Sequence, residues 1–213
     1  MHYKVTSQDL RKALGDIKSI RQQMARTTEF RGYGPATLAA TAVFAIVASA
    51  AQAAFVHDPV THVATYLGIW VSTALLSAGL TGAQMYTRSR RIHSVMSDEM
   101  IWMAVEQFLP SLSAGVLITI VLWGYVPAAL WLLPGIWQLV FSLGIFSSCR
   151  FLPRPMLAAG AWYLLTALVC VSLGDTRALS PWAMGIPYAV GQSLVAAVLL
   201  FASQEQEQDQ NES

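Results

Sequence analysis

Apolar runs of about 20 residues recur along the chain, and short polar connections separate them. Six runs are found, at residues 35–56, 66–86, 101–123, 128–146, 156–173 and 181–201. At a rise of 1.5 Å per residue, a helix of this length crosses the hydrocarbon core of a bilayer, which is about 30 Å thick. Helices satisfy every backbone group internally, as a bilayer requires. The pattern predicts an all-α integral membrane protein, a bundle of six transmembrane helices.

Composition supports the same class. Hydrophobic residues make up 55% of the chain and charged residues only 12%, whereas soluble domains carry about 25% charged residues. A soluble fold could not bury this much apolar surface. The net charge of +1 gives no indication of a nucleic-acid partner.

The basic residues predict the orientation. Twelve of the 13 lysines and arginines precede the first run, follow the second or follow the fourth; they are Lys4, Arg11, Lys12, Lys18, Arg21, Arg26, Arg31, Arg88, Arg90, Arg91, Arg150 and Arg154. Only Arg177 lies in the other three connections. Because cytoplasmic loops are enriched in Lys and Arg, both termini are expected in the cytoplasm.

The segment before the first run, residues 1–33, has the pattern of a basic amphipathic helix. Leu10, Leu14, Ile17, Ile20 and Met24 recur at three- and four-residue steps, with basic side chains mostly off that stripe. Two interpretations stay open: the helix lies on the anionic leaflet, or its stripe docks a cytoplasmic partner or a second copy of the chain. The candidate surface is Leu10, Arg11, Leu14, Ile17, Lys18, Arg21 and Met24.

The last segment, residues 203–213, is acidic and has no aliphatic or aromatic side chain. Such a segment cannot bury enough apolar surface to offset the entropy of ordering, so the composition predicts a disordered tail.

Catalytic chemistry has little support in the sequence. None of the four histidines lies inside a predicted span, so intramembrane serines lack a base and a b-type haem lacks axial ligands. The two cysteines are predicted on opposite membrane faces. His57, Asp58 and His62 have residue types that bind metals, but three polar residues in a short loop are more often solvated. We expect no catalytic residues, no cofactor and no metal.

Polar residues at membrane depth are the candidate site. Glu106 is the only charged residue in a predicted span, which makes it a functional candidate by default. It also lies only five residues after Ile101, so an interfacial position stays open. Pro110 frees the Glu106 carbonyl, four residues earlier in the helix. The candidate polar site is Glu106, Gln107, Pro110, Gln138 and Gln192.

Small residues recur every four positions in the sixth run, at Gly185, Ala189, Ser193 and Ala197. Such a face lets two helix backbones approach closely. The pattern predicts helix packing, either within the bundle or between two copies.

Three stretches carry a resemblance to a known group. The stretches "IRQQMARTTEFRGYGPATLAATAVFAIVASA", "PGIWQLVFSLGIFSSCRFLPRPM" and "LSPWAMGIPYAVGQSLVAAVLL" resemble uncharacterised bacterial six-helix inner-membrane proteins, often encoded beside a winged-helix transcriptional regulator. The resemblance implies a multi-pass protein of the bacterial cytoplasmic membrane. It supplies no catalytic residues.

Two functions follow as hypotheses. The first is a non-enzymatic membrane module, a sensor or an accessory or regulatory subunit, whose basic helix meets a partner or lipid. The alternative is a small transporter or channel in which Glu106 lines a polar path.

Overall fold

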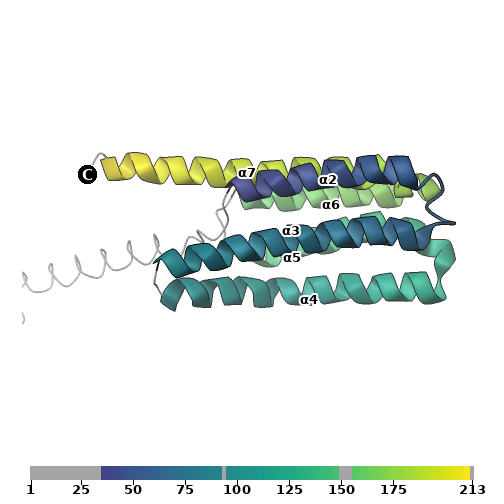
Figure 1. The fold of residues 1–213 in the computed structure, drawn as a ribbon, viewed down its shortest axis with the longest axis horizontal. Coiled ribbons are helices and arrows are strands. Elements are labelled where there is room, and N and C mark those ends of the chain that lie inside the picture. The colour runs from purple at the N-terminus through teal and green to yellow at the C-terminus, as the bar shows by residue number, and fades with distance from the viewer. Residues whose placement is uncertain (1–34, 93–94, 149–154, 212–213) are drawn as a thin grey trace, which may run out of the picture.

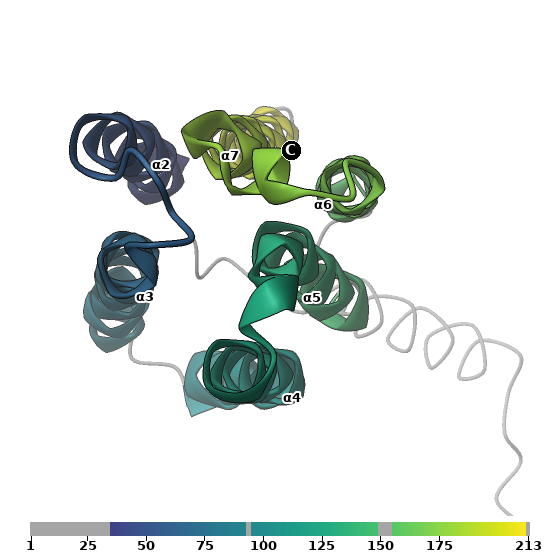
Figure 2. The same cartoon turned by 90° about the vertical axis from the view of Figure 1, so that its right-hand side faces the viewer.

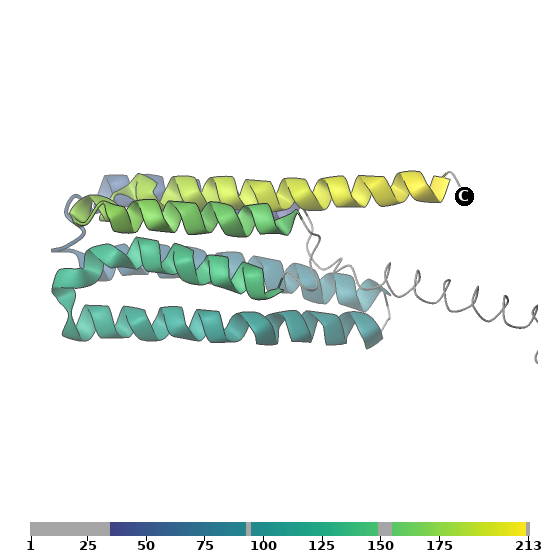
Figure 3. The same ribbon diagram turned by 180° about the vertical axis from the view of Figure 1, so that it is seen from behind.

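The computed structural model describes residues 35–92, 95–148 and 155–211, and these fold into a bundle of long, roughly parallel helices (Figure 1). The α-helices are α2 (Pro35–Phe55), α3 (Val63–Ile92), α4 (Val95–Tyr125), α5 (Leu133–Ser148), α6 (Met156–Ser172) and α7 (Pro181–Asn211). Two 3₁₀ helices, η1 (Pro127–Leu132) and η2 (Thr176–Leu179), lie at the same end. We call this end, with the connections 56–62 and 173–180, the loop end (Figures 1 and 3).

Among the residues that the structure describes, five segments are long and apolar enough to cross a membrane. They are Ala36–Phe55, Val63–Gln84, Glu106–Tyr125, Pro127–Ser148 and Pro181–Phe201. Helix α6 is apolar and shorter, with 17 residues, which corresponds to about 25 Å. The protein is therefore an all-helical bundle of membrane-protein character.

Helix α5 lies in the middle of the bundle when it is viewed from the loop end, with α4 on one side and α6 and α7 on the other (Figure 2). Its Leu133, Gln138 and Ser142 are fully buried. Helix α4, in contrast, buries little of its surface and exposes leucines such as Leu112 and Leu117. Apolar side chains on such a face suit contact with lipid.

Among the described helices, α2 and α7 make the most extensive contact. One stripe of α2 is buried, with Leu38, Thr41, Ala45 and Ser49 at three- and four-residue steps. On α7, a side chain at Gly185 would collide with Ser49, whose Cβ would lie 2.8 Å away. The missing side chain at Gly185 therefore lets the two helices approach closely.

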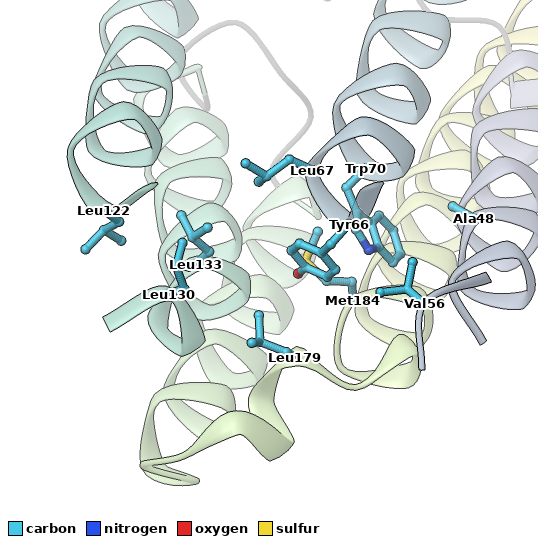
Figure 4. Packing of buried hydrophobic residues seen from close by; sticks show 10 residues of the cluster. All are labelled: Ala48, Val56, Tyr66, Leu67, Trp70, Leu122, Leu130, Leu133, Leu179 and Met184. Carbon is cyan, nitrogen blue, oxygen red and sulfur yellow. The ribbon is translucent and has the colours of Figure 1, made fainter. Parts of the chain in front are cut away.

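Buried apolar residues fill the loop end (Figure 4). The cluster joins α2, α3, α4, η1, α5, η2 and α7, and its members are Ala48, Val56, Tyr66, Leu67, Trp70, Leu122, Leu130, Leu133, Leu179 and Met184. A smaller cluster of Leu38, Met156, Ala196 and Leu199 joins α2, α6 and α7 at the opposite end. Packing in these clusters thus fixes α2 and α7 at both ends and α6 at the end opposite the loops.

The helices differ from the predicted runs mainly in length. Helices α3, α4 and α7 continue past residues 86, 123 and 201, and the fourth run begins as the 3₁₀ helix η1. Residues 203–211, expected to be disordered, continue α7 as helix. Glutamate and glutamine are good helix formers, and extending an existing helix needs no new nucleus. The predicted amphipathic helix at residues 1–33 lies outside the described residues.

Two separate glycine-to-alanine variants, one at the contact and one away from it, test the α2–α7 contact. We expect Gly185→Ala to destabilise the protein by about 1–3 kcal/mol, because the new methyl group overpacks against Ser49. Gly79→Ala in α3 is the matched control, since nothing lies within 4 Å of the added atom, and it should gain up to about 1 kcal/mol of helix propensity. Thermal unfolding in detergent measures the change in stability of each variant. Equal changes in the two variants would contradict the close α2–α7 contact at Gly185.

Candidate functional site

A proline inside α7 creates the main polar feature of the interior. Pro187 has no N–H, so the carbonyl of Ala183, four residues earlier, loses its helical hydrogen bond. Gln138 of α5 supplies the missing donor, with its Nε2 2.9 Å from that carbonyl oxygen. The Cys170 thiol of α6 donates to the same oxygen at 3.6 Å. Side chains from two other helices thus satisfy the carbonyl that Pro187 frees.

The backbone at the start of α7 and just before it is held in the same way from α2. Gln52 Nε2 donates to the Leu179 carbonyl at 2.7 Å, and Ser49 Oγ donates to the Pro181 carbonyl at 3.0 Å. The oxygen of the same amide also has a partner, because Trp70 Nε1 of α3 donates to Gln52 Oε1 at 2.7 Å. Gln52 is fully buried, so its donor and its acceptor are both used without water.

A fifth donor reaches α7 from α6. Trp162 Nε1 donates to the Pro187 carbonyl at 2.9 Å. We call the five donors to backbone carbonyls of residues 179–187 the α7 carbonyl contacts; the donors are Ser49, Gln52, Gln138, Trp162 and Cys170. The first two turns of α7 are therefore fixed by three surrounding helices.

A second polar group lies further along α7. Gln192 Nε2 is 3.4 Å from the Tyr163 hydroxyl, and its Oε1 accepts from Thr41 Oγ1 at 3.3 Å. Tyr163 also packs against Phe141 and Tyr188, with ring centroids 4.8 and 5.3 Å apart. Gln192 therefore links α2, α6 and α7.

Glu106 and Gln107 lie in another region. Glu106 is exposed on α4, five residues after Ile101. The next carbonyl, that of Gln107, accepts from Ser147 Oγ of α5 at 3.4 Å. Along α5, Ser147 is nine residues from Gln138, or about 13 Å. The five predicted site residues thus do not form one cluster.

The predicted small-residue face of α7 is divided between contact and surface. Gly185 packs on α2, as described above, whereas Ala189 and Ala197 are half-buried and Ser193 is exposed. Gly191 is a further position of close contact that the four-residue repeat does not include: an added Cβ there would meet the Tyr163 ring, with Cε2 at 2.6 Å. The sequence does indicate it, because a glycine directly before an intramembrane glutamine favours close packing at that depth.

The loop-end connections use their charges locally. Asp58 Oδ1 accepts from the backbone N–H of Val60 at 3.1 Å, which organises a turn. Asp175 caps η2 by accepting from Arg177 N–H at 2.9 Å, and the Arg177 side-chain contact holds the pKa of Asp175 below its ordinary value. Within the described ranges, no group of three or more His, Cys, Asp or Glu side chains could hold a metal.

The buried polar side chains are neutral. In the part of the chain that the structure describes, they include Thr41, Ser49, Gln52, Gln138, Ser142 and Ser148. Groups of this kind exchange hydrogen bonds between helices and do not transfer protons at neutral pH. The predicted partner or lipid surface, Leu10 to Met24, lies outside the described residues.

A double-mutant cycle tests the role of Gln138. We expect Gln138→Leu to cost about 0.5–1.5 kcal/mol of stability, because the Ala183 carbonyl loses its shortest donor. In a Pro187→Ala background the helix itself supplies an N–H to that carbonyl, so the same substitution should cost markedly less. Unfolding in detergent measures the four proteins, and an equal cost in both backgrounds would contradict the assignment.

No family model, curated protein or solved structure shows a significant match to this chain. Functional conclusions therefore depend on the sequence and on the geometry described above.

Proposed function

We propose that this protein is a six-span module of the bacterial cytoplasmic membrane, with both termini in the cytoplasm, that acts as a non-enzymatic sensor or as an accessory or regulatory subunit. The Lys and Arg asymmetry supports the orientation. Five long apolar helices and the shorter α6 support the number of spans. The resemblance described above supports the location.

The observation that carries this proposal is that glutamine side chains inside the bundle form hydrogen bonds to other parts of the protein. Gln52, Gln138 and Gln192 each bond to other helices or to the turn before α7. In membrane bundles, such bonds hold helices together. The interior thus supports a structural role for its polar side chains, and the proposed activity lies in the cytoplasmic segments.

The transporter alternative depends on Glu106 lining a path with Gln138 and Gln192. Glu106 is exposed on α4, and the two amides are engaged elsewhere. This arrangement gives the alternative less support than the module.

Single cysteines test the topology, in a background where both native cysteines are serine. Thr176→Cys, in the exposed η2 connection, should react with a membrane-impermeant maleimide in intact cells. Thr87→Cys, exposed near the end of α3, should react only in inside-out vesicles. The reverse pattern, or labelling of both sites from one side, would overturn the proposed orientation.

Deletion of residues 1–28 tests the proposed role of the N-terminal segment. We expect the shortened protein to insert and to unfold at the same temperature, because all six predicted spans lie within residues 35–201, while the partner that co-purifies with the full chain is lost.

Two matched variants refine this test. Leu14→Gln with Ile17→Gln removes apolar contacts from the stripe, whereas Lys18→Gln with Arg21→Gln removes charge and keeps the stripe. Loss of the partner in the first variant only would indicate an apolar docking face. Full retention of the partner after the deletion would refute the proposal.

A further inference from the structure

Two buried polar atoms near the loop end have no hydrogen-bond partner in the described structure: the hydroxyl of Tyr66 on α3 and Oε1 of Gln138 on α5. Tyr66 is 1% exposed and Gln138 is 0% exposed, so bulk solvent reaches neither. An unpaired buried hydroxyl or amide oxygen is costly, and native proteins usually satisfy such groups with protein or ordered water.

The orientation of the Gln138 amide follows from its neighbours. Its Nε2 lies 2.9 Å from the Ala183 carbonyl oxygen and 3.5 Å from Cys170 Sγ, so both amide hydrogens have acceptors. A flipped amide would place two oxygen acceptors against each other at Ala183. Oε1 is therefore the atom left without a partner, and it needs a donor.

The Tyr66 hydroxyl belongs to the same part of the interior. Its ring packs in the loop-end cluster with Leu133 and with Met184, the residue that follows Ala183 (Figure 4). Cys170 lies beside the Gln138 amide, since its Sγ is 3.5 Å from Gln138 Nε2. The hydroxyl is a donor, which matches the need for a bridging group at Gln138 Oε1.

We infer that the interior of the bundle holds an ordered water site lined by Tyr66, Gln138 and Cys170. Tyr66 donates to the water, and the water donates to Gln138 Oε1. Buried waters typically make about three hydrogen bonds to otherwise unsatisfied groups, which fits these three side chains. The site is independent of the proposed function and lies beside the α7 carbonyl contacts.

Radiolytic labelling of the purified full-length protein in lipid nanodiscs tests the site. Hydroxyl radicals formed from bound water oxidise the side chains next to it. Met184 and Met156 are matched, being 3% and 2% exposed, but only Met184 packs with Tyr66. We expect millisecond exposure to oxidise Met184 several-fold faster than Met156, as read by mass spectrometry. Equal rates would overturn the site.

Tyr66→Phe provides the second measurement. It should slow the oxidation of Met184 and leave Met156 unchanged, because it removes one water ligand. It should also lower the thermal midpoint by about 2–4 °C, because a used hydrogen bond is lost. An unchanged Met184 rate, or a raised midpoint, would show that the hydroxyl is simply unpaired and would overturn the inference.

Discussion

The carbonyl of Ala183 is the constraint on which the arrangement of the helices depends. Pro187 removes its partner within α7, and a hydrocarbon environment offers no water to replace it. The replacement donor must come from a neighbouring helix, and Gln138 reaches the carbonyl only if α5 lies next to α7. One missing N–H thereby fixes the position of α5 relative to α7 (Figure 2).

The remaining contacts at the start of α7 also join side-chain donors of other helices to backbone carbonyls. Ser49 and Gln52 bond to carbonyls at the start of α7, and Trp70 bonds in turn to Gln52. Association of helices in lipid cannot depend on hydrophobic burial alone, since lipid is as apolar as the side chains. Close approach at Gly185 and directed hydrogen bonds at the loop end therefore supply the specificity, while α4 keeps a largely apolar outer face.

The sequence predicts the helices better than their contacts. Prolines at 35 and 181 and Met156 mark helix starts that the structure places at the same residues. The far ends of α3 and α7 were less predictable. Hydropathy indicates where the apolar, lipid-facing part of a helix ends, but residues with high helix propensity can extend the helix beyond that point.

Partners across the bundle could not be predicted from the chain alone. Gln138 and Ala183 are 45 residues apart, and their contact depends on how α5 packs. Likewise, the exposed position of Glu106 depends on the rotation of α4, which a helix with an apolar surface nearly all round does not specify.

The length of α7 has a mechanical consequence. Its 31 residues form one continuous helix of about 46 Å, which packs against neighbouring helices from its first two turns to Leu199 and continues ten residues past Phe201. Because the helix is continuous, any tilt of the packed part carries these last residues with it. A tilt of a few degrees at the loop end would move the last turn by several ångströms, so a disturbance on one side of the bilayer would become a displacement on the other.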